Sequence, residues 1–287
     1  MQSLRECLNR VVKEKKAIGH FNISNIEGLW AVFKAARKLD VPVIIGTSEG
    51  ERDFLGVKQA VLLVKSLREE FDYPIFINAD HTYSLERVKE AIDAGYDAVI
   101  YDGAEQPFEE NIKITKQCVE YARSKNPEIL IEGELGYKGT ASEILDEIPK
   151  GVELGAEYLT KPDEAERFVK ETGVDLLAPA VGNFHGMLKR GDPALNIKVV
   201  KEVSQAAKVP LVLHGASGNS AEDIKAAIEN GVSIVHVSTE LRAAYTEALR
   251  KSLTDYPKEV APYKISKPAI EAMQKVAEEK LRIFNNL

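Results

Sequence analysis

The chain has 287 residues, 44% of them hydrophobic and 29% charged, with a formal net charge of −7. This length fits one α/β barrel, which takes about 250 residues, and the scattered positive charges form no basic block for nucleic acid. The longest apolar runs, such as AVLLV at 60–64, are far too short to cross a bilayer, and residues 1–16 lack the apolar core of a signal peptide. Two cysteines do not make a disulfide framework. We therefore expect a cytoplasmic protein without nucleic-acid or membrane partners.

Short runs rich in Val and Ile alternate along the chain with longer segments of helical period. In chain order, the expected strands are 17–23, 41–48, 73–79, 97–103, 128–135, 174–182, 209–215 and 232–238. The helix-like stretches between them include 25–39, 84–95, 108–124, 162–173 and 220–231. Such repeated βα units predict a parallel sheet. Eight strands, with no glycine fingerprint after the first, favour a closed (β/α)8 TIM barrel over an open doubly wound sheet.

Two segments depart from the repeat. Residues 136–160 separate the fifth strand from its helix without a clean period, and loops of that length in a compact domain tend to be functional or mobile. Residues 265–284 predict an additional C-terminal amphipathic helix that covers the barrel or contacts another subunit. Composition does not shift along the chain, so we expect a single domain, residues 1–287.

Each of the five histidines falls within or just beyond an expected strand. They are His20, His81, His185, His214 and His236. In a barrel the carboxyl ends of the strands form the catalytic face, so His81, His185 and His214 can converge there. Three imidazoles with an open fourth position suit a catalytic Zn²⁺. A single strand histidine is more often a core residue, but the three together, with glycines in NFHGM and LHGASG, favour a metal site.

Two turns near the end of the chain have the features of a phosphate site. HGASG at 214–218 precedes a helix expected to begin near Ser220, and the N–H groups of such a turn, with the helix dipole, favour an anion. STE at 238–240 opens the next helix similarly, and barrels frequently hold phosphate after strands seven and eight. The alternative for both is a tight turn with a helix cap. Lys189 is either a further cation for this anion or a solvated lysine.

Taken together, these motifs resemble those of the class II ketose-bisphosphate aldolases, the zinc-dependent group that contains fructose- and tagatose-bisphosphate aldolases. The resemblance rests on HFNISN, TSEG, DH at 80–81, PFEENI, EGELG, VGNFHG, LHGASG and STEL, and it runs from about residue 4 to residue 282. It is strongest to the shorter, tagatose-type branch. It implies a lyase of carbohydrate metabolism and glycolysis that reversibly cleaves a phosphorylated ketose, of the fructose or tagatose 1,6-bisphosphate type, to dihydroxyacetone phosphate and an aldehyde.

The resemblance also implies roles for individual residues. His81, His185 and His214 match the zinc ligands, with one catalytic ion per chain, and Glu134 matches a carboxylate that holds the metal in an alternative position. Asp80 matches the acid that exchanges a proton with the C4 hydroxyl. The positions that match substrate-binding residues are Asn22, Ser48, Gly186, Lys189, Gly215, Ala216, Ser217, His236, Val237, Ser238, Thr239 and Arg242, the last for the distal phosphate. We further expect a homo-oligomer, either a dimer or a tetramer, and the resemblance allows a monovalent cation.

Two departures from the family pattern bear on specificity. His236 stands where the family has an asparagine that touches the bound triose. The mobile loop, which usually reads like GGxED, is GTASE here, so Glu143 is the candidate for the acid that moves the triose proton. Because the three histidines and Asp80 are present, we still expect aldol chemistry. The alternatives are an aldolase for a mono-phosphorylated or otherwise altered ketose, and a catalytically silent barrel that binds a sugar phosphate.

Overall fold

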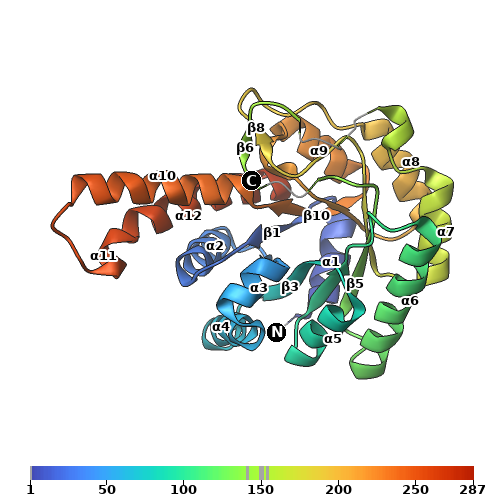
Figure 1. Cartoon of the computed structure of the whole chain (residues 1–287), viewed down its shortest axis with the longest axis horizontal. Helices are drawn as coiled ribbons and strands as arrows, with labels where there is room; N and C mark the ends of the chain where they lie inside the picture. The colour runs from blue at the N-terminus through green and yellow to red at the C-terminus, as the bar shows by residue number, and fades with distance from the viewer. Residues whose placement is uncertain (1, 140–141, 149–151, 153–154) are drawn as a thin grey trace.

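The computed structural model describes residues 2–139, 142–148, 152 and 155–287. Its barrel strands are β1 (Ile18–Asn22), β2 (Val43–Thr47), β3 (Ile75–Thr82), β4 (Ala98–Tyr101), β5 (Leu130–Leu135), β7 (Leu176–Pro179), β9 (Leu211–Leu213) and β10 (Val232–Val237). They close in the order β1-β10-β9-β7-β5-β4-β3-β2, with parallel pairing throughout (Figure 1). The predicted TIM barrel is confirmed. Seven strands lie within their expected runs, and β3 continues to Thr82, so Asp80 and His81 belong to it.

Helices surround the barrel, and five of them lie at the expected stretches 25–39, 84–95, 108–124, 162–173 and 220–231. The surrounding helices are α2 (Ile26–Leu39), α4 (Val57–Phe71), α5 (Leu85–Ala94), α6 (Phe108–Lys125), α7 (Pro162–Thr172), α8 (Ile197–Ala207), α9 (Ala221–Glu229) and α10 (Thr239–Asp255). The N-cap side chains of Asn25, Ser84, Asn196 and Ser220 each accept a backbone N–H of the first turn, which fixes where these helices begin. Within the described part of the chain, no helix combines the length and the apolar character that a membrane crossing needs.

The amino-terminal end of the barrel is closed by α1 (Leu4–Glu14), a helix that precedes the repeat. Its buried face packs on inward-pointing side chains at the starts of the strands, which are Ile18, Ile44, Phe76, Ala98, Leu130, Leu176, Val212 and Ile234. Side chains of a strand alternate between its two faces, so the next inward positions lie one layer nearer the carboxyl ends. In that layer His20, Glu132, His214 and His236 replace apolar residues. Polar side chains therefore occupy the barrel interior from about halfway along the strands.

Two further features flank the carboxyl face. The short strands β6 (Ile144–Leu145) and β8 (Met187–Leu188) pair in parallel, which ties the long loop after β5 to the segment that follows His185. Within that loop, residues 140–141 of the GTASE motif lie outside the described residues. The helix α3 (Glu49–Leu55) follows β2 directly and borders the same face.

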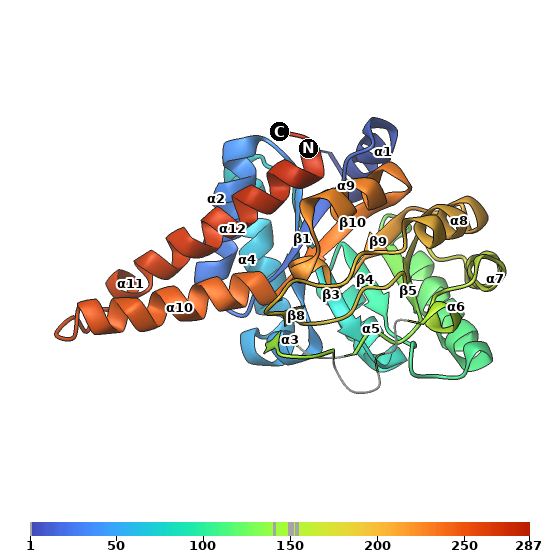
Figure 2. The same ribbon diagram turned by 90° about the horizontal axis from the view of Figure 1, so that it is seen from above.

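The C-terminal region forms an arm that projects from the barrel. The long helix α10 leads away from β10, α11 (Pro262–Ile265) forms the tip, and α12 (Lys267–Asn285) returns beside α10 (Figures 1 and 2). The returning helix also packs on α2 and β1. The expected additional C-terminal helix is therefore α12, and it both covers the barrel and builds the arm.

Candidate metal and substrate site

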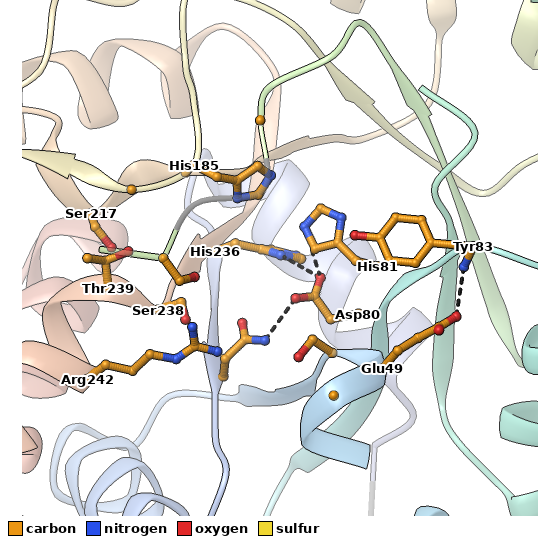
Figure 3. Close-up of a pocket in the computed structure, with 17 residues that line it drawn as sticks. Glu49, Asp80, His81, Tyr83, His185, Ser217, His236, Ser238, Thr239 and Arg242 are labelled. Carbon is orange, nitrogen blue, oxygen red and sulfur yellow. Dashed lines mark hydrogen bonds and ion pairs between the residues drawn. The ribbon is translucent and has the colours of Figure 1, made fainter. Parts of the chain in front are cut away.

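A cavity of about 280 Å³ opens at the carboxyl ends of the strands (Figure 3). Most of the predicted site residues line it, namely Asn22, Ser48, Asp80, His81, His185, Gly186, Gly215, Ser217, His236, Ser238, Thr239 and Arg242. The lining also includes Glu49 of α3, Tyr83 directly after β3, and Ser142 of the loop after β5. Side chains far apart in the sequence thus meet in one cavity, as the strand-end argument predicts.

The remaining predicted residues lie outside the lining. Ala216 and Val237 are buried behind it. Lys189 is largely exposed, and its ammonium lies 2.7 Å from Asp146 Oδ1. The side chain of Glu143 is exposed, while its carbonyl accepts the N–H of Met187. His214 and Glu134 are buried behind the lining, and Glu134 Oε2 lies 3.8 Å from His81 Nδ1.

A bulge lets two consecutive residues of β3 face the site. In a regular strand Asp80 and His81 would point to opposite faces. The pairing register with β4 shifts between Ala79 and Thr82, and His81 has a φ of 41°, in the left-handed region. Arg52 fixes this turn, because its guanidinium donates to the carbonyl of Asp80 and to the hydroxyl of Thr82, both at 3.0 Å. Both side chains of the DH motif therefore reach the cavity.

The three histidines predicted to bind metal come together at this face. Their ring centroids are 4.6 Å apart for His81 and His185, 4.9 Å for His81 and His214, and 5.7 Å for His185 and His214. His81 Nδ1 lies 2.7 Å from Asp102 Oδ2, and His214 Nε2 lies 2.8 Å from Glu132 Oε1. The opposite nitrogens of these two rings face each other at 3.3 Å. Carboxylates that hold one imidazole nitrogen and direct the other toward a shared point are typical of metal sites.

His185 completes a donor set that fits a divalent metal. Among the described residues, no donor or acceptor reaches its buried Nε2, and a buried polar atom without a partner is costly unless a ligand satisfies it. One ligand atom from each of His81, His185 and His214 lies within 4.8 Å of the others. Three nitrogen donors with room for a further ligand suit Zn²⁺.

Burial and neighbouring carboxylates set the protonation of these rings. Burial lowers the pKa of His185 and of His214 well below the ordinary value, so both rings are neutral, which is the form that binds a metal. Burial acts on His81 in the same direction, but the carboxylates of Asp80 and Asp102 outweigh it and raise the pKa of His81 to about 10. A metal at this site would therefore take the place of a proton on His81.

Glu134 forms a buried ion pair with a lysine of the loop after β5. Lys138 Nζ lies 2.7 Å from Glu134 Oε1, and neither side chain is more than 2% exposed. The same ammonium donates to the carbonyls of Gly136 and Ala178 at 3.0 and 3.3 Å. Burial raises the pKa of Glu134, while Lys138 opposes this. The carbonyl of Lys138 accepts the N–H of His185 at 2.8 Å, so this buried lysine connects Glu134 to the third histidine.

Asp80 is an ionised carboxylate at the edge of the histidine cluster. Asn22 Nδ2 donates to its Oδ2 at 2.9 Å, and His236 Nδ1 lies 3.4 Å from its Oδ1 (Figure 3). Burial would raise the pKa of Asp80, but the adjacent His81 and His236 hold it well below the ordinary range. The rings of His236 and His20 stack at 3.5 Å because β1 and β10 pair these two residues in register. His236 thus stands against Asp80 with a second buried ring behind it.

The turn that the sequence predicts as an anion site lies on the other side of the histidines. Gly215 has a φ of 62°, and a Cβ there would lie 2.0 Å from the carbonyl oxygen of Phe184, so only glycine allows the two loops to meet. Ser217 and Ser238 line the cavity beside it, and α10 begins at Thr239. In the described part of the chain the buried hydroxyl of Ser238 has no partner. The turn and the helix start together suit a phosphate group.

Sequence reasoning missed several buried or half-buried ionisable residues of the site, among them Asp102, Glu132, Lys138 and Glu51. Asp102 comes directly after β4, so the strand-end rule that selected His81 could have found it. Glu132 is two residues from Glu134 in the same strand and therefore faces the same way. No sequence signal marks Lys138 as buried. SEGE at 48–51 has the pattern of a capping box, so the sequence assigns Glu51 only the role of a helix cap and does not predict its other contacts.

Fold and site together define a class of protein: a TIM-barrel enzyme whose carboxyl face combines three imidazoles that fit a metal ion, an ionised acid and a turn that suits an anion. Comparison with known proteins gives the family. The family model for class II fructose-bisphosphate aldolase matches residues 2–287. The chain is 39% identical to the fructose-bisphosphate aldolase of Geobacillus stearothermophilus, over 99% of this chain and 96% of that one. It matches the crystal structure of the YdjI aldolase of Escherichia coli K12 with a TM-score of 0.82 and 32% identity, over 98% and 96% of the two chains.

The chain belongs to the class II fructose-bisphosphate aldolase family. It is therefore a carbon–carbon lyase that acts on a phosphorylated sugar, and metal dependence is typical of its family. The resemblance inferred from the sequence motifs is confirmed. The match extends over essentially the whole chain, so it includes the cavity as well as the barrel.

Proposed function

We propose that the protein reversibly cleaves a ketose that carries a phosphate on C1, as fructose and tagatose 1,6-bisphosphate do, to dihydroxyacetone phosphate and an aldehyde. The observation that carries this proposal is the ionised Asp80 directly beside three imidazoles that fit one divalent cation. In this proposal His81, His185 and His214 hold one Zn²⁺ per chain. Residues 1–287 act as one domain.

Asp80 acts as the acid–base group. As the C3–C4 bond breaks, its carboxylate accepts the proton of the C4 hydroxyl, and in condensation it returns that proton. Asn22 holds one oxygen of Asp80 and His236 faces the other, so the carboxylate keeps one orientation. A divalent cation at the imidazoles would stabilise the negative charge that develops on the triose half.

The phosphate on C1 binds at the turn formed by Gly215 and Ser217 together with the start of α10. Backbone N–H groups there and the free hydroxyl of Ser238 are the donors. This location places C1 of the ketose on the side of the histidines away from Asn22. Lys189 contributes only if it leaves Asp146, since the two are paired in the structure.

Glu143 remains our candidate for the group that exchanges the proton of the triose. Its backbone is held next to Gly186 by the pairing of β6 with β8. Ser142 beside it lines the cavity, and in this proposal the exposed carboxylate of Glu143 turns toward a bound triose. Glu134 remains a candidate for an alternative metal position, although Lys138 occupies one of its oxygens.

Metal analysis and kinetics on the purified protein test the proposal. We expect about one Zn²⁺ per chain, loss of aldol cleavage after chelation, and recovery when Zn²⁺ is added back. A His185→Ala variant should lose the metal, because three ligands become two. Full activity in metal-free protein contradicts the mechanism. Binding of phosphorylated sugars without turnover, in zinc-loaded protein, instead indicates the catalytically silent barrel.

The C-terminal arm supports the proposal of a homo-oligomer. Its tip exposes large apolar side chains, with Tyr256, Val260 and Tyr263 exposed by 62%, 86% and 75%. Such side chains grouped at the end of a projecting hairpin are typical of an interface, so we propose that the tip packs on a second copy of the chain. Light scattering should give a dimer or tetramer, and Val260→Glu should shift the mass toward the monomer. Cys7 and Cys118 are free thiols, which fits our placement of the enzyme in the cytoplasm.

A further inference from the structure

A buried carboxylate lies directly behind the end of the cavity that is nearest Asp80. Glu51, on the first turn of α3, is 7% exposed. Its Oε2 accepts from Asn22 Nδ2 at 3.0 Å, from the Ser48 N–H at 2.8 Å and from Ser48 Oγ at 2.9 Å. Its Oε1 accepts from Arg242 Nη2 at 2.5 Å. Four donors from three elements thus converge on one carboxylate.

A helix cap does not account for this arrangement. A capping-box glutamate accepts one bond, from the backbone N–H of the N-cap residue, which here is Ser48. The amide of Asn22, the hydroxyl of Ser48 and the guanidinium of Arg242 are additional donors. A guanidinium, an amide, a hydroxyl and a backbone N–H are the kind of set that binds the carboxylate or phosphate of a ligand. In this protein Glu51 supplies that anion from within the chain.

The donors held by Glu51 are consequently unavailable to a substrate. Asn22 Nδ2 has two hydrogens, and they go to Glu51 and to Asp80. The backbone N–H and the hydroxyl of Ser48 both go to Glu51. Arg242 is the one arginine or lysine among the described residues that line the cavity, and its charge is offset by this ion pair.

The end of the cavity is also acidic beyond this pair. Glu49 lines the cavity, and its Oε1 accepts the backbone N–H of Tyr83 (Figure 3). Glu49 therefore adds a second carboxylate on the side of the cavity where, in the proposed function, the aldehyde half of the ketose lies. It lies 4.0 Å from the guanidinium of Arg87, which Asp53 and Glu90 also share. A second phosphate on that half meets like charge, whereas uncharged hydroxyl groups meet carboxylate acceptors.

We infer that Glu51 is a specificity-determining residue that fills the position of a distal anion, so that the enzyme selects a ketose phosphorylated on C1 alone, with an uncharged, hydroxylated far end. This inference rests on the proposed function and specifies its substrate class. The aldehyde product is then an uncharged hydroxyaldehyde. Selectivity arises mainly by rejection of the second phosphate, since like charges at a recognition site act chiefly against the wrong ligand.

The zinc-loaded full chain tests the inference without any variant. The value of kcat/KM is measured for cleavage of fructose 1-phosphate and of fructose 1,6-bisphosphate, and for condensation of dihydroxyacetone phosphate with glyceraldehyde and with glyceraldehyde 3-phosphate. We expect the substrate with the uncharged end to be favoured by about 100-fold in both directions. Equal efficiencies, or a preference for the bisphosphate, overturn the inference.

Variants then locate the cause of the selectivity. Glu51→Gln keeps the size of the side chain but removes its charge, and the preference should move at least about tenfold toward the bisphosphate, mainly through KM. Asp53→Asn is the matched control, because Asp53 is on the same helix and 65% exposed; the preference should not change. An unchanged preference in folded Glu51→Gln overturns the role of this residue. If that variant does not fold, the wild-type comparison above decides.

A half-reaction separates this inference from the proposed function. Exchange of the hydroxymethyl protons of dihydroxyacetone phosphate with D₂O, followed by NMR, uses the metal and the C1-phosphate turn but not the end near Glu51. Exchange together with a preference for the bisphosphate overturns the inference and leaves the proposed function intact. Absence of both exchange and cleavage overturns the proposed function, and the inference with it.

Discussion

Replacement of the buried Lys138 by methionine should destabilise the metal-free protein severely. Methionine fills the same volume but removes the ammonium that pairs with Glu134 and donates to the carbonyls of Gly136 and Ala178. Removing one partner of a buried ion pair leaves the other charge without compensation, which costs about 3–5 kcal/mol. With an unfolding entropy of about 2.1 cal/mol/K per residue, the chain of 287 residues loses about 5–8 °C in Tm.

Thermal unfolding followed by circular dichroism in the presence of a chelator measures this loss. Lys189→Met is the matched control, since Lys189 is also paired with an acid but is 59% exposed, and its Tm should stay within about 2 °C of wild type. Adding Glu134→Gln to Lys138→Met should recover part of the lost Tm, because the buried negative charge is gone. A Lys138→Met protein that melts within 1 °C of wild type refutes the buried-pair reasoning.

Three further predictions concern the histidines and Asp80. Asp80→Ala should reduce kcat by about 10²–10⁴-fold while the zinc content stays near one per chain, because the aspartate moves a proton and holds no metal in our proposal; equal loss of zinc and activity contradicts this. Gly46→Ala should cost about 1–3 kcal/mol in unfolding free energy, since the new Cβ would lie 2.0 Å from the His20 ring. Gly50→Ala, where the new methyl meets no atom within 4 Å, should be neutral or stabilising in the same melts. The Lys138→Met protein should also bind Zn²⁺ about 10–100-fold more weakly in a competition titration, because the lost ammonium contacts fix the backbone whose carbonyl holds His185.

The barrel could be predicted from the sequence because its strands are buried on both faces. Such strands are continuous apolar runs, and helix caps such as Ser84 and Ser220 mark where the next helix begins. The same rule places Asp80 and His81 at the catalytic face. It does not explain how both reach the cavity, because a regular strand would separate them. The bulge at the end of β3 brings both side chains to the cavity. Its residue of positive φ is a histidine rather than a glycine, so the sequence gives no signal for the bulge.

Partners that lie far apart in the chain set the rest of the site. Lys138 follows Glu134 by four residues in an irregular loop, where a lysine is ordinarily solvated, and only the tertiary contacts bury it. Glu51 meets Arg242 across 191 residues, a contact that no local pattern encodes. The stacking of His20 on His236 depends on the register between β1 and β10. Sequence patterns thus predicted where the reactive side chains lie. Which charged groups pair with one another could be seen only in the folded chain.

The charge balance at the site gives a physical reason for a divalent cation at this face. The pKa values of Asp80 and Asp102 are both lowered, against the effect of burial, and the protonated ring of His81 contributes to both shifts. One imidazolium, 4.0 Å from Asp80 and 2.7 Å from Asp102, thus serves two carboxylates, and buried carboxylates are costly without equal positive charge. A divalent cation that replaces the proton of His81 would supply two positive charges for these two acids. Glu134, whose Oε2 lies 3.8 Å from the same ring, depends less on that charge, because Lys138 pairs with its Oε1. This fixed lysine leaves most of the charge of an exchangeable cation to Asp80 and Asp102.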